Sequence, residues 1–224
     1  MLVVRDLVKR FPTGDGEVVR AIDGVSLTVS GGELVALYGP SGSGKTTLLK
    51  IIAAVLEPDR GEVALRGRSV LGLRERDATL YRLRDLGLVL QTFHLVAGLS
   101  AGENAALKLI ADGVPRPEAR RRVEPLLRQL GLDTRLEHRT GDLSMGERQR
   151  LALAKALSND PPLVLADEPT GSLDTVRGRA VLRMLRNHGR ARSAITVIAT
   201  HDPKAARFAD TVYTLRDGRL VIGR

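Results

Sequence analysis

Residues 39–47 bring three glycines, two serines, a lysine and two threonines together, directly ahead of a strongly apolar stretch. Gly39, Gly44, Lys45 and Thr46 fit the spacing G-x-x-x-x-G-K-[S/T]. Glycines let backbone N–H groups turn inward around phosphate oxygens, where a Cβ would obstruct them. Lys45 can reach the terminal phosphates of a nucleotide, and the Thr46 hydroxyl can ligate Mg²⁺. The loop therefore predicts a nucleotide site whose phosphate-binding residues are Gly39, Pro40, Ser41, Gly42, Ser43, Gly44, Lys45, Thr46 and Thr47. A flexible linker is the alternative, but a linker does not need Lys-Thr at the start of a helix.

A second cluster of polar groups ends an apolar run at residues 163–168, where Asp167 and Glu168 precede a proline. Ligands of an open α/β sheet bind outside the carboxyl ends of its strands. Asp167 is therefore expected to hold magnesium. Adjacent strand residues point to opposite faces, so Glu168 is expected to polarise a water for attack on the γ-phosphate. The alternative is a plain acidic strand end, which is a weaker explanation beside a phosphate loop.

The elements around these residues must place both clusters at one edge of a sheet. Apolar runs bounded by Gly and Pro predict strands, and 3.6-residue periodicity predicts helices. The expected strands are 2–11, 18–29, 31–39, 61–67, 86–91, 161–167 and 193–200, followed by a hairpin that turns at Asp217-Gly218. The expected helices are 45–56, 103–111, 118–130 with a kink or break at Pro125, 147–157 and 175–187.

Strands and helices that alternate in this way indicate an α/β protein with a mainly parallel core sheet. Strand signals vanish over residues 92–159, which are predicted to form an inserted α-helical subdomain. The chain is thus expected to be a single domain, 1–224, of P-loop NTPase type. Residues 1–91 and 160–224 would form the core together with an N-terminal antiparallel β subdomain.

The amino-acid composition limits the compartment and the partners that are expected for the protein. The 224 residues include no Cys, so disulfides and Cys-ligated zinc are excluded and a reducing compartment is expected. No signal peptide or transmembrane stretch is evident, so the protein is expected to be intracellular and peripheral. The net charge of +9 is compatible with an anionic partner or with a solvated basic face. With three Tyr, three Phe and no Trp, base-stacking platforms are hard to build, so no nucleic-acid partner is expected.

Over its whole length and in motif order, the chain resembles the ATP-binding subunit of ABC transporters. Residues 39–46 match the Walker A loop, and residues 163–167 match Walker B. Gln91 follows an apolar strand as the family's Q-loop glutamine does, residues 172–174 match the D-loop, and His201 matches the switch histidine. The phrases FHLVAGLSAGENAAL and NDPPLVLADEPTGSLD resemble the lipoprotein-release and macrolide-export branch.

Residues 143–147 resemble the family signature motif, with two departures from L-S-G-G-Q. Met145 replaces the first glycine and Glu147 replaces glutamine, while Ser144 and Gly146 remain. Ser144-x-x-Glu147 is also an ordinary capping box for the next helix, and the two interpretations are compatible. A positive φ at Met145 would be strained, and this strain would weaken the closure of two copies of the chain into a dimer.

The resemblance implies a mechanism. Two copies would sandwich two ATP molecules, so that each site combines the Walker loops of one copy with the signature helix of the other. Phe11 would stack on adenine, although a strand core position is the alternative. The resemblance places Phe11, Gln91, Ser144, Gly146, Glu147 and Asp174 among the ATP-binding residues beside the loop at 39–47. It places Thr46, Gln91 and Asp167 on Mg²⁺, and Lys45, Glu168 and His201 in catalysis.

The implied function is ATP hydrolysis that energises a separate integral membrane permease, from the cytoplasmic face of the membrane and as an ATP-dependent homodimer. An ATPase coupled to a non-transporting membrane partner, such as a cell-division or signalling complex, is the alternative.

Overall fold

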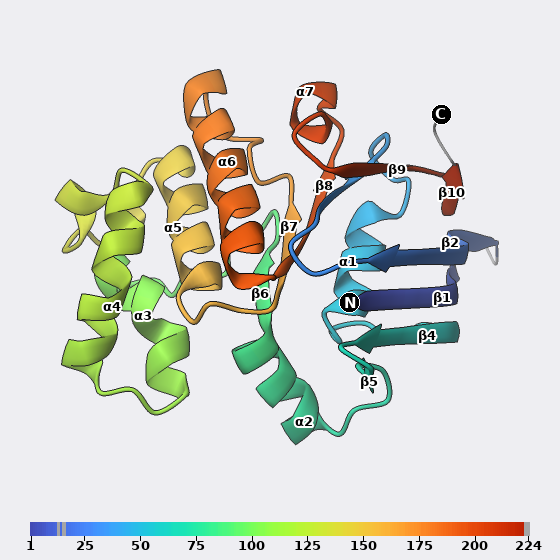
Figure 1. Cartoon of the computed structure of the whole chain (residues 1–224), viewed down its shortest axis with the longest axis horizontal. Helices are drawn as coiled ribbons and strands as arrows, with labels where there is room; N and C mark the ends of the chain where they lie inside the picture. Colours follow the sequence, from blue (N-terminus) through green and yellow to red (C-terminus); the bar gives the residue numbers. More distant parts are fainter. Residues whose placement is uncertain (13, 15–16, 222–224) are drawn as a thin grey trace.

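The computed structural model describes residues 1–12, 14 and 17–221, which form two sheets with helices around them (Figure 1). A four-stranded antiparallel sheet has the order β2-β1-β4-β5, and a six-stranded sheet has the order β10-β9-β3-β8-β7-β6. The first sheet contains β1 (Leu2–Pro12), β2 (Val18–Val29), β4 (Arg60–Leu65) and β5 (Arg68–Ser69). The second contains β3 (Leu34–Tyr38), β6 (Leu86–Val89), β7 (Leu163–Asp167), β8 (Ile195–Thr200), β9 (Thr211–Arg216) and β10 (Arg219–Val221). Its strands are parallel except for β10, which turns back on β9, so the predicted α/β class is confirmed.

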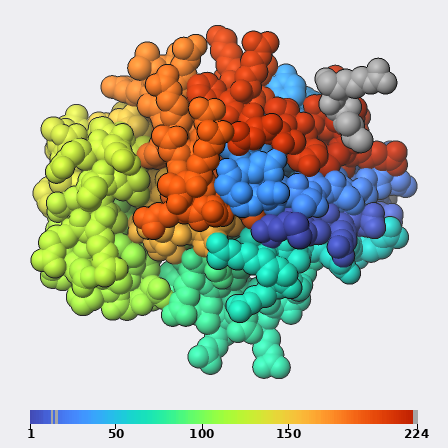
Figure 2. All heavy atoms as spheres, in the orientation of Figure 1, coloured from blue at the N-terminus to red at the C-terminus, as the bar shows by residue number. Residues whose placement is uncertain are grey.

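The helices lie between the two sheets, against the core sheet and at one end of the molecule. They are α1 (Lys45–Ile52), α2 (Glu75–Leu80) with a π-helical turn (Tyr81–Asp85), α3 (Ala101–Ala111), α4 (Arg116–Gln129), α5 (Met145–Leu157), α6 (Thr175–Arg192) and α7 (Pro203–Ala206). Short 3₁₀ turns cover Asp133–Arg135 and Thr140–Asp142. Figure 2 shows α3 and α4 at one end and the antiparallel sheet at the other.

The core sheet is apolar on both faces, as expected of parallel strands covered on both sides. Successive residues of β3 alternate: Leu34 and Ala36 pack with helices α3 to α6, whereas Val35 and Leu37 pack with α1 and the antiparallel sheet. The α1 side chains belong to the same cluster as residues of both sheets. Helix α1 is therefore buried between the sheets, which explains its strong hydrophobicity and fixes its N-terminus in space.

Some predicted boundaries are wrong, and the backbone shows why. Helix α1 ends at Ile52 because the chain turns left-handed at Ala54, and the N–H groups of Val55 and Leu56 bond to the Lys50 carbonyl. Helix α6 continues to Arg192, where a left-handed Ser193 ends it.

Helix α4 runs through Pro125, so of the predicted kink or break the break is wrong, and the kink stays a prediction. The proline ring is exposed, and the carbonyl of exposed Arg121, which loses its helical partner, can bond to water instead. Elements α2, its π-helical turn, β5 and α7 were not predicted. They are short, and α2 carries charges without a clear apolar stripe.

Candidate functional site

A pocket of about 690 Å³ opens at the carboxyl end of the core strands. Most of the predicted site residues line it together: Ser41, Gly42, Gly44, Lys45, Thr46, Thr47, Gln91, Asp167, Glu168 and His201. The remaining lining comes from Val19, Arg20 and Ala21 of β2 and from the hairpin turn at Asp217 and Gly218. Sequence reasoning missed these five, since only the folded chain brings β2 and the last hairpin to the loop.

The phosphate loop is held too tightly against its neighbours to accept side chains at two positions. A Cβ on Gly44 would lie 2.2 Å from the Ala21 carbonyl oxygen, and the residue adopts a φ of 102°. A Cβ on Gly39 would lie 2.2 Å from the Leu215 carbonyl oxygen. These glycines are thus required by close packing of backbone on backbone, in addition to any need for space around a ligand.

The start of α1 has no side-chain cap in the described part of the chain, because its N-cap residue is Gly44. The first N–H groups of a helix lack intrahelical partners and carry the positive end of its dipole, so this N-terminus is suited to an anion. The Lys45 side chain is 7% exposed and donates from Nζ to the carbonyl oxygens of Gly39 and Pro40, both at 2.8 Å. The Lys45 ammonium therefore lies inside the loop, where the phosphate oxygens of a ligand can replace the two carbonyls.

Thr46 and Asp167 meet at the bottom of the pocket. On β7, Leu163 and Leu165 face α1, and Asp167 continues that alternation. Its Oδ2 accepts a hydrogen bond of 2.6 Å from Thr46 Oγ1. Burial raises the pKa of Asp167 and the nearby Glu168 carboxylate adds to the rise, while Thr46 and Lys45 oppose it.

These oxygens fit a magnesium ion. A hydroxyl and a carboxylate already in contact are hard oxygen donors, and the exposed Gln91 amide lines the same pocket. Mg²⁺ is usually held by one or two carboxylates together with phosphates and waters. In the described residues there is no cluster of three or more His, Cys, Asp or Glu that could hold a metal ion.

Glu168 departs from the strand and points to another set of partners. Its backbone is left-handed, with a φ of 49°, an uncommon conformation outside glycine. Oε1 accepts from the His201 backbone N–H at 3.0 Å and lies 2.6 Å from His201 Nδ1, while Oε2 accepts from Thr200 Oγ1 at 3.2 Å. When Glu168 is ionised it can only accept, and the contact then requires the proton on His201 Nδ1. The pair provides a carboxylate and an imidazole at the pocket edge.

Other residues predicted for ATP binding lie outside the pocket lining. Phe11 is 37% exposed, and Lys9 Nζ lies 5.5 Å from the centroid of its ring. Its strand partner across the β1–β2 pair is Val19, which does line the pocket, so the Phe11 ring lies on the same face of the sheet. Ser43 is buried within the loop, Gly39 is buried beneath it, and Pro40 is exposed.

The signature segment starts α5 with the predicted capping box. The Ser144 hydroxyl accepts from the Glu147 backbone N–H, and the Glu147 carboxylate accepts from the Ser144 backbone N–H and hydroxyl. Arg135 Nε donates to the other Glu147 oxygen at 2.8 Å. Arg135 and the Ser144 hydrogen bonds hold the pKa of Glu147 at about 2. Met145 is helical and 60% exposed, so the strain expected from a positive φ does not arise.

Gly146 and Asp174 belong to one surface separate from the pocket. A Cβ on Gly146 would lie 3.1 Å from the Ser172 carbonyl oxygen. Asp174 caps α6 by accepting from the Arg177 N–H at 2.9 Å, and its second oxygen lies 3.3 Å from the Arg177 guanidinium. Ser144, Gly146, Glu147 and Asp174 do not line the pocket of their own chain, so they cannot contribute to it within one copy.

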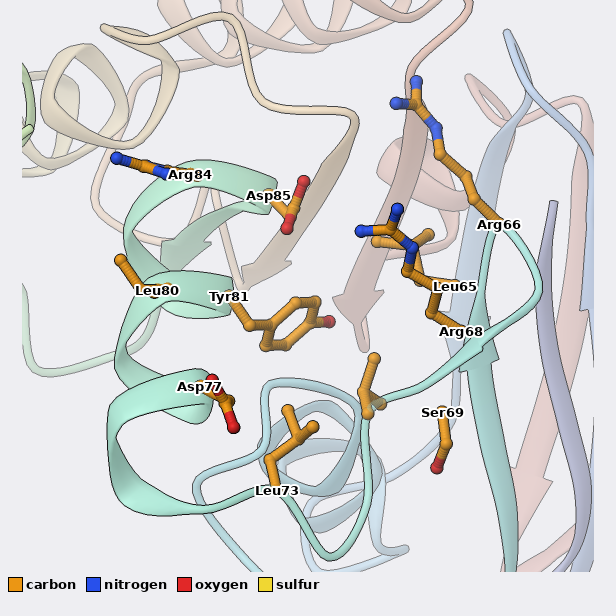
Figure 3. Close-up of a pocket in the computed structure, with 11 residues that line it drawn as sticks. Leu65, Arg66, Arg68, Ser69, Leu73, Asp77, Leu80, Tyr81, Arg84 and Asp85 are labelled. Carbon is orange, nitrogen blue, oxygen red and sulfur yellow. The ribbon is translucent and has the colours of Figure 1, made fainter.

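A second groove, of about 600 Å³, lies between β4–β5 and α2 (Figure 3). The ring of Tyr81 points into it, and its hydroxyl donates to the Ile52 carbonyl oxygen at 2.8 Å. Arg66, Arg68 and Asp77 stand around the rim. None of the residues predicted to handle phosphate, magnesium or water lines this groove, so the first pocket is the candidate site.

Within the part of the chain that the structure describes, every helix is too short or too polar to span a membrane.

Comparison with known proteins agrees with the geometry. The family described as ABC transporter matches residues 22–171. Lipoprotein-releasing system ATP-binding protein LolD 2 of Caulobacter vibrioides is 44% identical over 224 residues, which cover 100% of this chain and 98% of that protein. Macrolide export ATP-binding/permease protein MacB of Hyphomonas neptunium is 39% identical over 99% of this chain, which spans 34% of that protein. The dimeric post-hydrolysis structure of the ATP-binding cassette MJ0796 with ADP and Pi has a TM-score of 0.94 and 34% identity, and the match covers 99% of this chain and 97% of that one. The chain belongs to the ABC transporter family.

Proposed function

We propose that the chain binds and hydrolyses ATP as a Mg²⁺-dependent subunit that energises a separate integral membrane permease. The observation that carries this proposal is the convergence of Lys45, the Thr46–Asp167 pair and the Glu168–His201 pair on one pocket. These residues come from three distant parts of the sequence. Nucleoside triphosphate hydrolysis needs a cation that binds phosphate, a pair of magnesium ligands and a carboxylate that orients water, all at one site.

Nucleotide binding would start from the phosphate loop. The uncapped N–H groups of α1 and the Lys45 ammonium would hold the phosphates, with Lys45 leaving its two loop carbonyls to do so. Thr46, Asp167 and Gln91 would hold the Mg²⁺ ion, which neutralises charge on the β- and γ-phosphate oxygens when bound. Phe11 would meet the adenine from the face of the antiparallel sheet that carries Val19.

Hydrolysis would depend on Glu168. Its carboxylate would orient the attacking water and accept its proton, while His201 would stabilise charge at the γ-phosphate. The contacts of Glu168 with Thr200 and His201 already fix the direction of its carboxylate before ATP arrives. Such positioning lowers the cost of reaching the transition state.

The second half of each site would come from another copy of the chain. Ser144, Gly146, Glu147 and Asp174 form a separate surface, and the N-terminus of α5 is the positive end of a helix dipole, which suits a phosphate of the opposite copy. The matched MJ0796 cassette was solved as a dimer, which supports an ATP-dependent homodimer here.

The membrane partner is proposed from the relatives. LolD 2 is named as the ATP-binding protein of a lipoprotein-releasing system, and MacB is named as an ATP-binding/permease protein. By that likeness, the chain would act at the cytoplasmic face of a membrane, in the lipoprotein-release or macrolide-export branch. The helical subdomain at 92–159 would dock the permease, and Gln91 at its start would report the state of the nucleotide.

Titration calorimetry with Mg-ATP tests whether the phosphate loop at residues 39–47 binds the nucleotide. Lys45→Ala should weaken binding about 10- to 100-fold, because it removes a charge-assisted contact to phosphate. Lys204→Ala, which changes an exposed lysine on α7, is the matched control and should bind as the wild type does. An unchanged affinity of Lys45→Ala for Mg-ATP would show that the phosphate loop is misassigned. Phosphate release by the wild-type subunit, alone and with its co-purified membrane partner, tests hydrolysis and coupling.

A further inference from the structure

Gln149 lies on α5, one turn beyond the capping box, and is 3% exposed. Its Nε2 donates to the Glu168 backbone carbonyl at 2.7 Å, and its Oε1 accepts from the Ser172 backbone N–H at 3.0 Å. The amide orientation is determined by these partners, since the reverse assignment would place oxygen against oxygen and N–H against N–H. Gln149 therefore satisfies both ends of the turn that follows β7.

That turn contains the uncommon backbone of Glu168. Beyond the Gln149 contact, the Glu168 N–H bonds to the Ala199 carbonyl at 2.9 Å, and the Gly171 N–H bonds to the Glu168 carbonyl at 3.1 Å. A left-handed residue other than glycine persists when its surroundings hold it in place. Here β8 holds one side of the residue, and α5, through Gln149, holds the other.

We infer that Gln149 is a positioning residue for Glu168: it holds the turn at 168–172 so that the Glu168 carboxylate faces the pocket, and it ties that carboxylate to the signature helix. This role rests on the proposed ATPase function. A core glutamine that only satisfies buried backbone groups would have the same contacts, but its loss would affect folding rather than turnover.

Kinetic measurements distinguish the positioning role of Gln149 from a purely structural role. In Gln149→Ala, ATP affinity should stay within about twofold, since Gln149 does not line the pocket. Phosphate release at saturating ATP should fall about 10- to 100-fold, the cost of a displacement of about 1 Å in a catalytic group. Gln129→Ala, at the exposed end of α4, is the matched control and should keep wild-type turnover.

Gln149→Glu provides a rescue. When ionised, the new carboxylate faces the Glu168 carbonyl oxygen without a proton to donate, so turnover should fall as in Gln149→Ala. When protonated, it can again donate to that carbonyl and accept from the Ser172 N–H. Burial raises the pKa of such a carboxyl, so protonation occurs in an accessible range. The variant and the wild type share every other titratable group, so the ratio of variant to wild-type turnover isolates the new carboxyl and should rise as the pH is lowered.

The experiment measures ATP affinity, thermal unfolding and single-turnover phosphate release of wild type, both Gln149 variants and Gln129→Ala. Selective loss of turnover in Gln149→Ala, with a recovering ratio in Gln149→Glu, supports the positioning role. Equal losses of affinity and turnover, a variant that does not fold, or wild-type turnover in a folded variant would each overturn it. A wild-type subunit that releases no phosphate even with its membrane partner would reject the proposed function instead.

Discussion

Glu168→Gln should separate nucleotide binding from hydrolysis, at a small cost to the stability of the fold. Amide oxygen can replace Oε1 and still accept both bonds from His201. The new NH₂ would face Thr200 Oγ1, which already accepts from the Asp202 N–H at 3.0 Å. A hydroxyl oxygen has two lone pairs, so it can accept both bonds if its own proton turns away. The fold should therefore survive, with a loss of about 1 kcal/mol where a charged hydrogen bond becomes neutral.

The catalytic cost is much larger. Removing a general base typically lowers the rate about 10²–10⁴-fold, which corresponds to about 3–5 kcal/mol in the barrier. In the proposed site nucleotide binding would rest on residues 39–47 and Asp167, so the affinity for Mg-ATP should remain within a few-fold of wild type. Uncleaved ATP should then hold two copies together, and removal of a carboxylate near the γ-phosphate relieves repulsion.

The assay combines single-turnover phosphate release, Mg-ATP titration and size-exclusion chromatography with and without Mg-ATP. Glu62→Gln makes the same chemical change on a side chain that is 75% exposed on β4, and it should behave as wild type in all three measurements. Near-wild-type phosphate release by folded Glu168→Gln would reject Glu168 as the base. Parallel loss of affinity and turnover would show that the residue serves binding rather than proton transfer.

Three further outcomes are expected. Gly44→Ala should destabilise the fold by about 1–3 kcal/mol and remove ATP binding, because its Cβ would meet the Ala21 carbonyl at 2.2 Å; thermal unfolding and ATP titration check this. Arg135→Ala should lower the free energy of unfolding by about 1 kcal/mol at pH 7. The stability linked to Glu147, whose folded pKa is about 2 against an ordinary 4.5, is present above about pH 4.5 and lost as the pH falls toward 2, so the variant's deficit should shrink over that range in urea titrations. Met145→Gly should leave the ATP affinity of the monomer within twofold, because Met145 is exposed and outside the pocket; a large loss would contradict the assignment of the signature helix to the opposite copy.

The sequence predicted the parts of the site that depend on local order. The loop at 39–47 and the Asp167–Glu168 pair each follow a strand, so strand and helix patterns were enough to place them at one sheet edge. The capping box at Ser144 was likewise readable from spacing of three residues.

Contributions that depend on tertiary packing could not be predicted. Val19 to Ala21 enter the pocket because β2 packs over the phosphate loop, and no local pattern encodes that approach. The left-handed backbone of Glu168 is equally invisible, since alternation along a strand assumes that the strand continues. Gln149 looks like any polar residue on an otherwise ordinary helix, and its importance rests on a turn that begins 19 residues later.

The signature helix gives a physical reason why the two halves of such a site should not act independently. Helix α5 carries Ser144 and Gly146 at its exposed N-terminus and Gln149 one turn further, inside the protein. Gly146 already lies so close to the Ser172 carbonyl that even a methyl group would be tight, so little slack separates the helix from the turn. A shift of α5 on meeting a second copy's nucleotide would therefore move the Glu168 carbonyl through the Gln149 amide. Met145, where the chain departs from the family motif, is exposed and makes none of these contacts with the turn. The departure leaves the Gln149 bonds to Glu168 and Ser172 in place, so the proposed link from the signature helix to Glu168 is retained.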